Sequence, residues 1–467
     1  MKIGWNGCRK CTSLLFGLVA LGVLTTQPAA AGQSASSGVT FAKDVAPILQ
    51  RACQNCHRPG GVGPMSLLSF EDVRPWARSI KLKTGKREMP PWFIEKDIGI
   101  QKFKDDISLS DEEISTIARW VDGGAPRGNP AEMPPPRQFA DAAGWSFGTP
   151  DLLVSSPVMT VKAVAPDYHG FLKPAATGLT EDRYIKAVEV KEVRLEDKAF
   201  KRTAGQAGDL NLFVVHHAVI STQKGPQDGT GDDVVSGNEV SSPGRDFHLT
   251  HELGQNATIY PDDVGVRLPA KSALGYKVHL HSVGREVPVR IDVAFKFHPN
   301  GYKPKYTFTS AGASSGYLRD LDIPAGADNV RFDSVYTLSK PGRLVTFEPH
   351  MHASGKRMCV EATYPSGRRE MLNCAGYNHN WVKVYSYEDG VAPLLPAGTI
   401  LHVIGWYDNS ANNPRNIDPR NWKGYGNRSV DDMFLFLGRM VALTEEQFKE
   451  EVAARAAKQR QNATSQQ

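Results

Sequence analysis

Two hydrophobic patterns divide the chain into a helical N-terminal part and a longer β-rich part. Between residues 114 and 121, apolar side chains recur at the spacing of one helix face, Ser110 and Glu113 form a capping box before them, and Gly123 is suited to end the helix. Residues 289–297 instead alternate apolar and polar side chains, which is typical of a strand with one buried face. Similar short runs recur beyond residue 150 and favour antiparallel sheets.

The length of 467 residues predicts about three domains, because one hydrophobic core seldom serves so long a chain. We predict a multidomain fold in which a small all-α domain precedes two antiparallel β-sandwich, jelly-roll-like domains. Prolines and glycines around residues 124–150 favour an extended linker between them. The predicted boundaries are 1–31 for a signal peptide, 41–128 for the all-α domain, 129–150 for the Pro-rich linker, 151–305 and 306–445 for the sandwiches, and 446–467 for a helical or disordered tail.

The N-terminus has the features of a secretory signal. Lys2, Arg9 and Lys10 precede an apolar run from Leu14 to Leu24, and Ala29–Ala31 offers small side chains for cleavage, so we expect a periplasmic or secreted protein. No later run approaches the roughly 20 apolar residues of a spanning helix, so no membrane span is expected in the mature chain. The net charge of +5 falls to about +2 without the leader, which gives no indication of nucleic-acid binding.

The motif C-x-x-C-H at residues 53–57 is the most specific chemical signal in the chain. Cys53 and Cys56 would bind the vinyl groups of a haem covalently, and His57 would ligate its iron. The alternative, a disulfide or a redox dithiol, does not explain the histidine that follows directly. For the second axial ligand we expect Met89, with Met65 as the competitor. The all-α domain is therefore predicted to be a cytochrome c domain that carries haem c.

The remaining cysteines predict a disulfide. Cys8 and Cys11 leave with the leader, so Cys359 and Cys374 are left, and a Pro-Ser-Gly turn lies midway between them. A hairpin around that turn would place the two thiols at facing positions. A structural disulfide there agrees with an oxidising compartment.

Paired histidines in the β-rich part predict metal binding. His350 and His352 are two residues apart, so on a strand they share one face and can grip a metal together, while Met351 points into the core. His216 and His217 are adjacent, and successive strand side chains diverge, so joint ligation needs a twist or a bulge. The alternative for this pair is one ring inside and one outside.

Further candidate ligands complete a donor set that favours copper. His279 and His281 share a strand face, and we expect one of them, rather than both, to bind. Met433 adds a thioether, and imidazole with thioether suits copper better than zinc or a hard cation. No pattern assigns the other histidines, which we expect to be structural or surface residues: His169, His248, His251, His298, His379 and His402.

The order and spacing of four short motifs carry a family resemblance. They are His216-His217, Val278-His279-Leu280, His350 to Lys356, and Asp431-Asp432-Met433. Residues 150–445 thereby resemble the copper type II, ascorbate-dependent monooxygenases, the family of peptidylglycine α-hydroxylating monooxygenase and dopamine β-hydroxylase. Residues 406–413 also look like those of bacterial proteins that join such a module to a cytochrome c domain.

The resemblance implies two β-sandwich domains that face each other across a solvent cleft and hold two copper ions, one each. The implied ligands are His216, His217 and His279 for the electron-supplying copper, and His350, His352 and Met433 for the catalytic copper that activates dioxygen. His281 matches no ligand of the family. The implied reaction is hydroxylation of a C–H bond of a small-molecule substrate, with one atom of dioxygen in the product and the other in water.

Three departures from the family pattern bear on the substrate. Glu348 stands where the peptide-processing members have an arginine, and Leu435 and Leu437 replace an asparagine and a tyrosine. Those family residues fix a substrate carboxylate, whereas a glutamate would repel it and leucine offers no hydrogen bond. We therefore expect a basic or neutral, partly apolar substrate.

We expect the tethered haem to supply single electrons to the copper sites at high effective concentration. A periplasmic electron donor would in turn reduce the haem. A second hypothesis is an electron-transfer or copper-binding cytochrome fusion without oxygenase activity. A zinc hydrolase ranks last because no H-E-x-x-H motif occurs and a methionine ligand would be out of place.

Overall fold

The computed structural model describes residues 38–59, 63–139, 145–195, 213–224, 246–252, 254–307, 320–416, 418–426, 428 and 430–464. The chain forms two compact units, Met1–Gly38 and Val39–Gln467. The first unit, with the predicted signal peptide, lies almost wholly outside the described residues, so the description concerns the second unit. Within the described ranges, no helix has the length and apolar character needed to cross a membrane.

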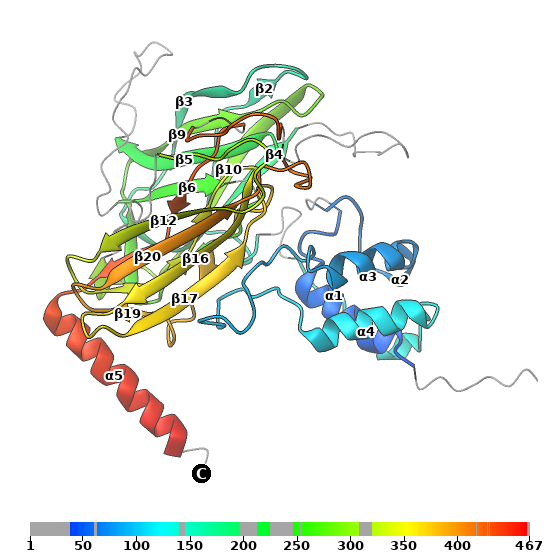
Figure 1. The fold of residues 1–467 in the computed structure, drawn as a ribbon, viewed down its shortest axis with the longest axis horizontal. Coiled ribbons are helices and arrows are strands. Elements are labelled where there is room, and N and C mark those ends of the chain that lie inside the picture. The colour runs from blue at the N-terminus through cyan, green and yellow to red at the C-terminus, as the bar shows by residue number, and fades with distance from the viewer. Residues whose placement is uncertain are drawn as a thin grey trace, which may run out of the picture. The chain divides into compact units, whose positions relative to one another are not determined.

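Short helices form the N-terminal part of this unit (Figure 1). They are α1 (Ala46–Ala52), α2 (Phe70–Val73), α3 (Ala77–Gly85) and α4 (Asp111–Asp122), with a π-helical turn at Phe41–Val45 and 3-10 turns at Arg74–Trp76 and Pro130–Glu132. The predicted capping box is confirmed, since Ser110 Oγ accepts a hydrogen bond from the Glu113 amide at 3.1 Å and Glu113 Oε2 accepts one from the Ser110 amide at 2.8 Å. Gly123 follows α4 as its C-cap.

Two sheets build the first β-rich region. A seven-stranded sheet has the order β1-β10-β4-β8-β11, with β2 on β10 and β7 on β4, and a four-stranded sheet has the order β3-β9-β5-β6. Its strands are β1 (Leu152–Ser155), β2 (Met159–Val161), β3 (Tyr168–Ala176), β4 (Arg183–Arg194), β5 (Val215–Lys224), β6 (His248–Glu252), β7 (Thr258–Ile259), β8 (Val264–Leu268), β9 (Ser272–Leu280), β10 (Val287–Phe297) and β11 (Tyr306–Thr307). One hydrophobic core takes side chains from both sheets, including Ile220, Tyr276 and Phe295.

The second β-rich region is built on a four-stranded sheet of order β12-β20-β16-β17 (Figure 1). Three small sheets belong to the same region: β19-β13-β22, β14-β18 and β15-β21. Its strands are β12 (Val330–Thr337), β13 (Gly342–Leu344), β14 (Thr346–Phe347), β15 (Pro349–His350), β16 (Gly355–Thr363), β17 (Arg369–Gly376), β18 (Tyr385–Ser386), β19 (Leu394–Leu395), β20 (Ile400–Tyr407), β21 (Leu435–Phe436) and β22 (Met440–Ala442). Helix α5 (Glu445–Thr464) follows and buries none of its residues.

The cysteines left by the leader and the haem motif meet in this second region. Cys359 and Cys374 face each other in the register of β16 and β17 and are joined, with an S–S distance of 2.00 Å. The Pro-Ser-Gly turn therefore closes a hairpin that the disulfide crosses.

The predicted fold class is wrong in its first part, because the N-terminal helices do not form a separate, compact all-α domain. They belong to the same unit as the sheets, and part of the predicted domain packs into the β-rich core. Trp92 meets Tyr385 edge to face at a centroid distance of 4.9 Å, and Phe103 stacks on Tyr387 at 5.2 Å. Sheets that pack together as in a β-sandwich are present, as expected for the rest of the chain.

Backbone hydrogen bonds tie the same segment, residues 93–104, to the edge of the second β-rich region. The Glu95 amide donates to the Cys374 carbonyl at 2.9 Å, and the Ile100 amide donates to the Leu372 carbonyl at 2.9 Å. Gly99 has a φ of +65°, and an added Cβ would lie 2.0 Å from the Leu372 oxygen, so only glycine fits there. The segment covers the outer edge of β17, which would otherwise be exposed.

The packing of Phe103 in the β-rich core predicts the effect of Phe103→Ala. Because Phe103 is 5% exposed within the β-rich core, its truncation should destabilise that core by about 3–5 kcal/mol, seen as an earlier loss of near-UV circular dichroism on heating. Trp76→Ala, at a side chain that is 44% exposed, is the matched control and should leave the transition unchanged. If the thermal unfolding transition of Phe103→Ala is unchanged, Phe103 does not stabilise the β-rich core, and a separate N-terminal domain would again be the better interpretation.

Candidate metal centre

Three histidines converge on adjacent strands of the four-stranded sheet. His216 and His217 lie on β5 and His279 on β9, and one ring nitrogen from each lies within 4.8 Å of the other two. The pairing of β5 with β9 slips between Val215 and His217, so His216 is the extra residue of a β-bulge. The bulge turns both adjacent rings to one side, and their Nδ1 atoms lie 3.3 Å apart. We call these residues the three-histidine group.

The ring of His279 is fixed from its outer side. Its Nε2 lies 3.0 Å from Asp167 Oδ2, so Nε2 carries the proton and donates it, while Nδ1 is buried without a hydrogen-bond partner. This carboxylate–imidazole arrangement is the one that commonly orients a metal-ligating histidine. His169 stacks on His279 at a centroid distance of 3.9 Å and 21° between planes. Asp167, His169 and His279 also gather within 4.8 Å, but two nearly parallel rings direct their lone pairs side by side rather than toward one ion.

His350 and His352 form a second candidate site, as their spacing predicts. Their ring centroids lie 5.6 Å apart, and both side chains are buried, as is Met351. His352 Nδ1 lies 3.1 Å from the Asp431 carbonyl oxygen, and His350 Nδ1 lies 3.6 Å from Glu252 Oε1. The hydrogen bond of His352 occupies Nδ1 and leaves Nε2 for a ligand, whereas His350 Nδ1 is too far from the carboxylate for a hydrogen bond and is buried without a partner.

Asp432 joins the segments that carry His352 and Met433. Its Oδ1 accepts hydrogen bonds from the His352 amide at 2.9 Å and the Met433 amide at 3.0 Å, and its Oδ2 accepts from the Ser354 amide at 3.2 Å and from the Ser354 hydroxyl. Strands β15 and β21 pair His350 with Leu435, which brings the Met433 segment toward His352. Met433 is 7% exposed, and its carbonyl accepts a hydrogen bond from the Tyr407 hydroxyl at 2.6 Å.

The two groups of histidines are neighbours, whereas the family resemblance implies a solvent cleft between them. The rings of His216 and His352 are 5.4 Å apart, and His379 lies against both, at 5.0 Å and 5.4 Å. His281, which matches no ligand of the family, accordingly lies outside the three-histidine group, with Nε2 bonded to the Phe213 carbonyl. Among the described residues, neither group of three titratable ligands within 4.8 Å includes His350 or His352, so a third donor there would have to be of another kind.

Polar contacts hold the two β-rich regions together around these rings. Asn256 brackets the backbone of Val384, with its Nδ2 donating to the carbonyl at 3.0 Å and its Oδ1 accepting from the amide at 3.1 Å. Lys383 Nζ donates to the Gly254 carbonyl at 2.6 Å. An added Cβ at Gly254 would lie 2.6 Å from the Asn380 oxygen, so the backbones approach closely here. We call these contacts the inter-sheet clamp.

Glu348 does not meet solvent at this junction, contrary to the role in substrate choice that its position predicts. It is 1% exposed, and its Oε1 accepts a hydrogen bond from Gln255 Nε2 at 3.0 Å. Burial raises the pKa of Glu348 to about 7, against the opposing pull of Arg439. Burial, with the nearby Glu348 charge, raises the pKa of Glu252 well above its usual range. Because both carboxyls are buried, they do not indicate the charge of a substrate.

Burial disfavours the charged form of three of these imidazoles. It lowers the pKa of His217 to about 3 and holds the pKa of His216 and of His350 well below its usual range, and neighbouring imidazoles act in the same direction. A neutral imidazole has one free lone pair, which is the form that binds a metal.

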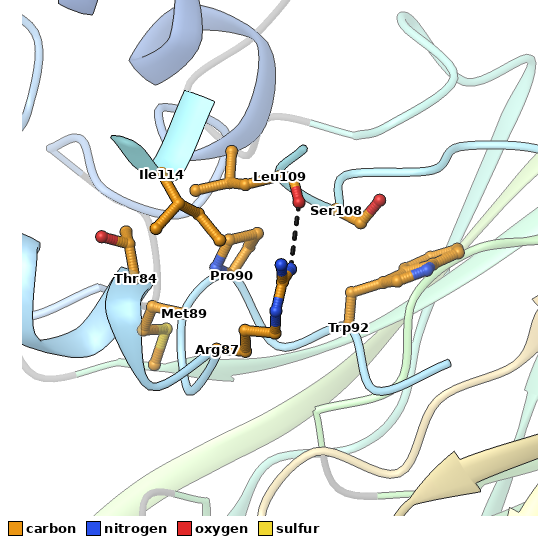
Figure 2. Close-up of a pocket in the computed structure, with 8 residues that line it drawn as sticks. All are labelled: Thr84, Arg87, Met89, Pro90, Trp92, Ser108, Leu109 and Ile114. Carbon is orange, nitrogen blue, oxygen red and sulfur yellow. Dashed lines mark hydrogen bonds between the residues drawn. The ribbon is translucent and has the colours of Figure 1, made fainter. Parts of the chain in front are cut away.

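The residues of the haem motif lie at the end of α1. Cys53 and Cys56 are free thiols, and His57 Nδ1 lies 3.2 Å from the Met65 carbonyl oxygen, so Nε2 is available for a ligand. Gly63 packs so closely on this ring that an added Cβ would lie 2.5 Å from Nδ1. Met89 follows α3 and lines a small pocket with Arg87, Pro90, Leu109 and others, where Arg87 Nη1 donates to the Leu109 carbonyl at 3.2 Å (Figure 2). Free thiols beside an oriented imidazole fit covalent haem.

Three residues of the site have no role that the sequence assigns. Asp167 lies just before β3 and orients the ring of His279, and no local spacing signals such a contact. Asp432 belongs to a motif of the family resemblance, where a carboxylate beside a candidate ligand could indicate a supporting role. His379 is one of the histidines that no pattern assigns, and no second histidine accompanies it in the sequence.

Comparisons with known proteins add no family assignment. No family model matches the chain, and no curated protein matches it. Similar solved structures include the cowpea mosaic virus top component, with 10% identity over 63% of this chain and 90% of that chain and a TM-score of 0.26. Broad bean stain virus gives 8% identity over 62% and 89% with a TM-score of 0.28, and PNGF-II gives 8% over 62% and 65% with a TM-score of 0.23. Scores this low carry no argument about fold or function.

The position of Asp432 predicts that its loss weakens metal binding without removing a ligand. Asp432→Ala frees the His352 and Met433 amides together, so the affinity of the second site for Cu(I) should fall about 10–100-fold in a chelator competition. Asp418→Ala, at a partly exposed carboxylate bonded to Arg420, is the matched control. Equal affinities in both variants would refute the supporting role of Asp432.

The inter-sheet clamp predicts a pH dependence of stability. Burial lowers the pKa of Lys383 from 10.5 to about 8, so between these values the unfolded chain holds the proton and the folded chain does not. Folding therefore becomes more favourable as pH rises from 8 to 10.5. The difference in free energy of unfolding, wild type minus Lys383→Met, should therefore increase by about 3 kcal/mol between pH 8 and pH 10.5. For Lys303→Met, at an exposed lysine, the corresponding difference should not change with pH. A difference that is also independent of pH for Lys383→Met would contradict the lowered pKa of buried Lys383.

Proposed function

We propose that this protein is an exported, haem- and copper-dependent monooxygenase that hydroxylates a C–H bond of a small-molecule substrate with dioxygen. The observation that carries the proposal is the convergence of five imidazoles from two β-rich regions, four of them buried and that of His217 partly buried: His216, His217, His279, His350 and His352. Buried ring nitrogens are costly to keep without partners, and a metal ion offsets that cost.

The donor set supports copper over other metals. The three-histidine group offers nitrogen donors, and the second site would combine His350 and His352 with the Met433 thioether, a soft donor that favours Cu(I). Copper, when bound, would supply one-electron redox chemistry and the activation of dioxygen. The chain's own part is to hold the lone pairs in place, through Asp167 on His279 and the Asp431 carbonyl on His352.

The haem would provide electrons to these sites. Cys53 and Cys56 would attach it, and His57 with Met89 would ligate its iron. Hydroxylation consumes two electrons that arrive singly, and a covalently linked carrier keeps a donor at high effective concentration. The signal-like N-terminus supports a periplasmic or secreted location, where a separate electron donor would reduce the haem.

The surroundings of the second site favour a neutral, partly apolar substrate. Leu435 and Leu437 are partly exposed beside the strand of His350, and Glu348 is sealed beneath. Leucine side chains cannot fix a carboxylate, so a peptidylglycine is not the substrate that this surface suits.

The second candidate function is electron transfer or copper binding without oxygen chemistry. The close contact between the two groups of histidines favours it, because metals held that close together could exchange electrons readily whether or not a substrate binds. Oxygen uptake coupled to product formation separates the two functions.

The proposal predicts about two coppers per haem in the intact protein, with Cu(II) signals in electron paramagnetic resonance. Met433→Ala and His350→Ala should abolish substrate-dependent oxygen uptake while the haem spectrum stays intact. His402→Gln, at a partly exposed ring bonded to Asp333, is the control and should keep both.

Stopped-flow mixing with oxygen tests the role of the haem in the same proteins. Reduced haem should be oxidised faster when copper and substrate are both present. If the haem is oxidised at the same rate in all mixtures, it takes no part in the reaction. If the wild-type protein binds no copper, the proposed function is wrong.

A further inference from the structure

His379 is the histidine of the site that the proposed ligand sets leave out. It lies between β17 and β18, and its Nε2 is 3.2 Å from Nε2 of His216, a residue of the first β-rich region. No hydrogen-bond partner meets its Nδ1 among the described residues. One ring nitrogen of His379 therefore contacts a proposed metal ligand across the junction of the two regions.

The loop that carries His379 is held in place by the inter-sheet clamp. Lys383 and Val384, a few residues further on, bond to Gly254 and Asn256. Trp381 packs against the close approach at Gly254, where an added Cβ would lie 2.7 Å from its ring. The backbone of this loop is thus held against the first β-rich region within a few residues of His379.

The direction of the hydrogen bond follows from the geometry around His216. Its Nδ1 faces His217 Nδ1 at 3.3 Å, on the side of the three-histidine group, so that nitrogen must have a free lone pair to bind a metal. A neutral imidazole carries one proton, which must then lie on Nε2. If His379 donated instead, the proton of His216 would lie on Nδ1 and block the metal position. Metal binding therefore requires His379 as the acceptor.

We propose that His379 is a positioning residue that accepts a hydrogen bond from His216 Nε2 and so fixes the metal-binding tautomer of His216. The inference rests on the proposed function in that it takes the three-histidine group to bind metal. Its consequence is that a residue of the second β-rich region completes a metal site of the first, so the affinity of that site depends on the docking of the two regions. Asp167 has the same role for His279, but within one region.

Substitutions at position 379 test this in the full chain with Cu(II) as the probe. His379→Phe keeps a ring of similar size without an acceptor, and should lower the affinity of the three-histidine group about 10–100-fold in chelator competition and shift its copper hyperfine splitting. His379→Gln keeps an acceptor at similar reach and should restore most of the affinity. His402→Phe is the control for loss of a histidine elsewhere.

Two outcomes would overturn the inference, and neither coincides with failure of the proposed function. Wild-type affinity and an unchanged copper signal in His379→Phe would show that His216 needs no acceptor. Equal losses in His379→Phe and His379→Gln, with thermal unfolding lowered in both, would show that the ring acts only in packing. The proposed function would fail on a different result: wild type binds no copper, or the copper that it binds is unaffected by His217→Ala.

Discussion

The burial of imidazoles with unpartnered nitrogens is the constraint on which the site depends. Each buried polar atom left without a partner costs about 1–3 kcal/mol, and His279 Nδ1 and His350 Nδ1 are both in this state. A chain that keeps such atoms must offset the cost. Metal ions do so, because a coordinate bond takes up the free lone pair, and the outer nitrogen of His279 is already held by Asp167.

Backbone irregularity and close packing produce this arrangement. The bulge at His216 turns two adjacent rings to the same side, which a regular strand would not allow. The inter-sheet clamp then brings the second group of histidines against the first, so that polar backbone groups from both regions are satisfied at the junction. The site is thus a property of two packed sheets and does not belong to either sheet alone.

The periodic parts of this architecture could be predicted from the sequence, whereas long-range contacts could not. The alternation over residues 289–297 gave β10, and Ser110 with Glu113 gave the start of α4, because both signals are local. Trp92 and Phe103 are apolar residues near helices, and nothing in their spacing distinguishes packing on a haem from packing on a sheet. This explains the wrong all-α domain.

The same limit applies to the site. His350 and His352 could be predicted as a pair because residues two apart in an extended segment share a face, although β15 itself ends at His350. The sequence indicated that His216 and His217 needed a bulge, but could not say that one forms. His379 shares no local pattern with its partner, since 163 residues separate it from His216.

Anomalous diffraction at the copper edge, from crystals of the copper-loaded full-length protein, tests the central claim most directly. The account predicts two copper peaks, one contacted by His216, His217 and His279 and the other by His350, His352 and Met433. A single peak elsewhere, or copper peaks that none of these side chains contacts, would contradict it.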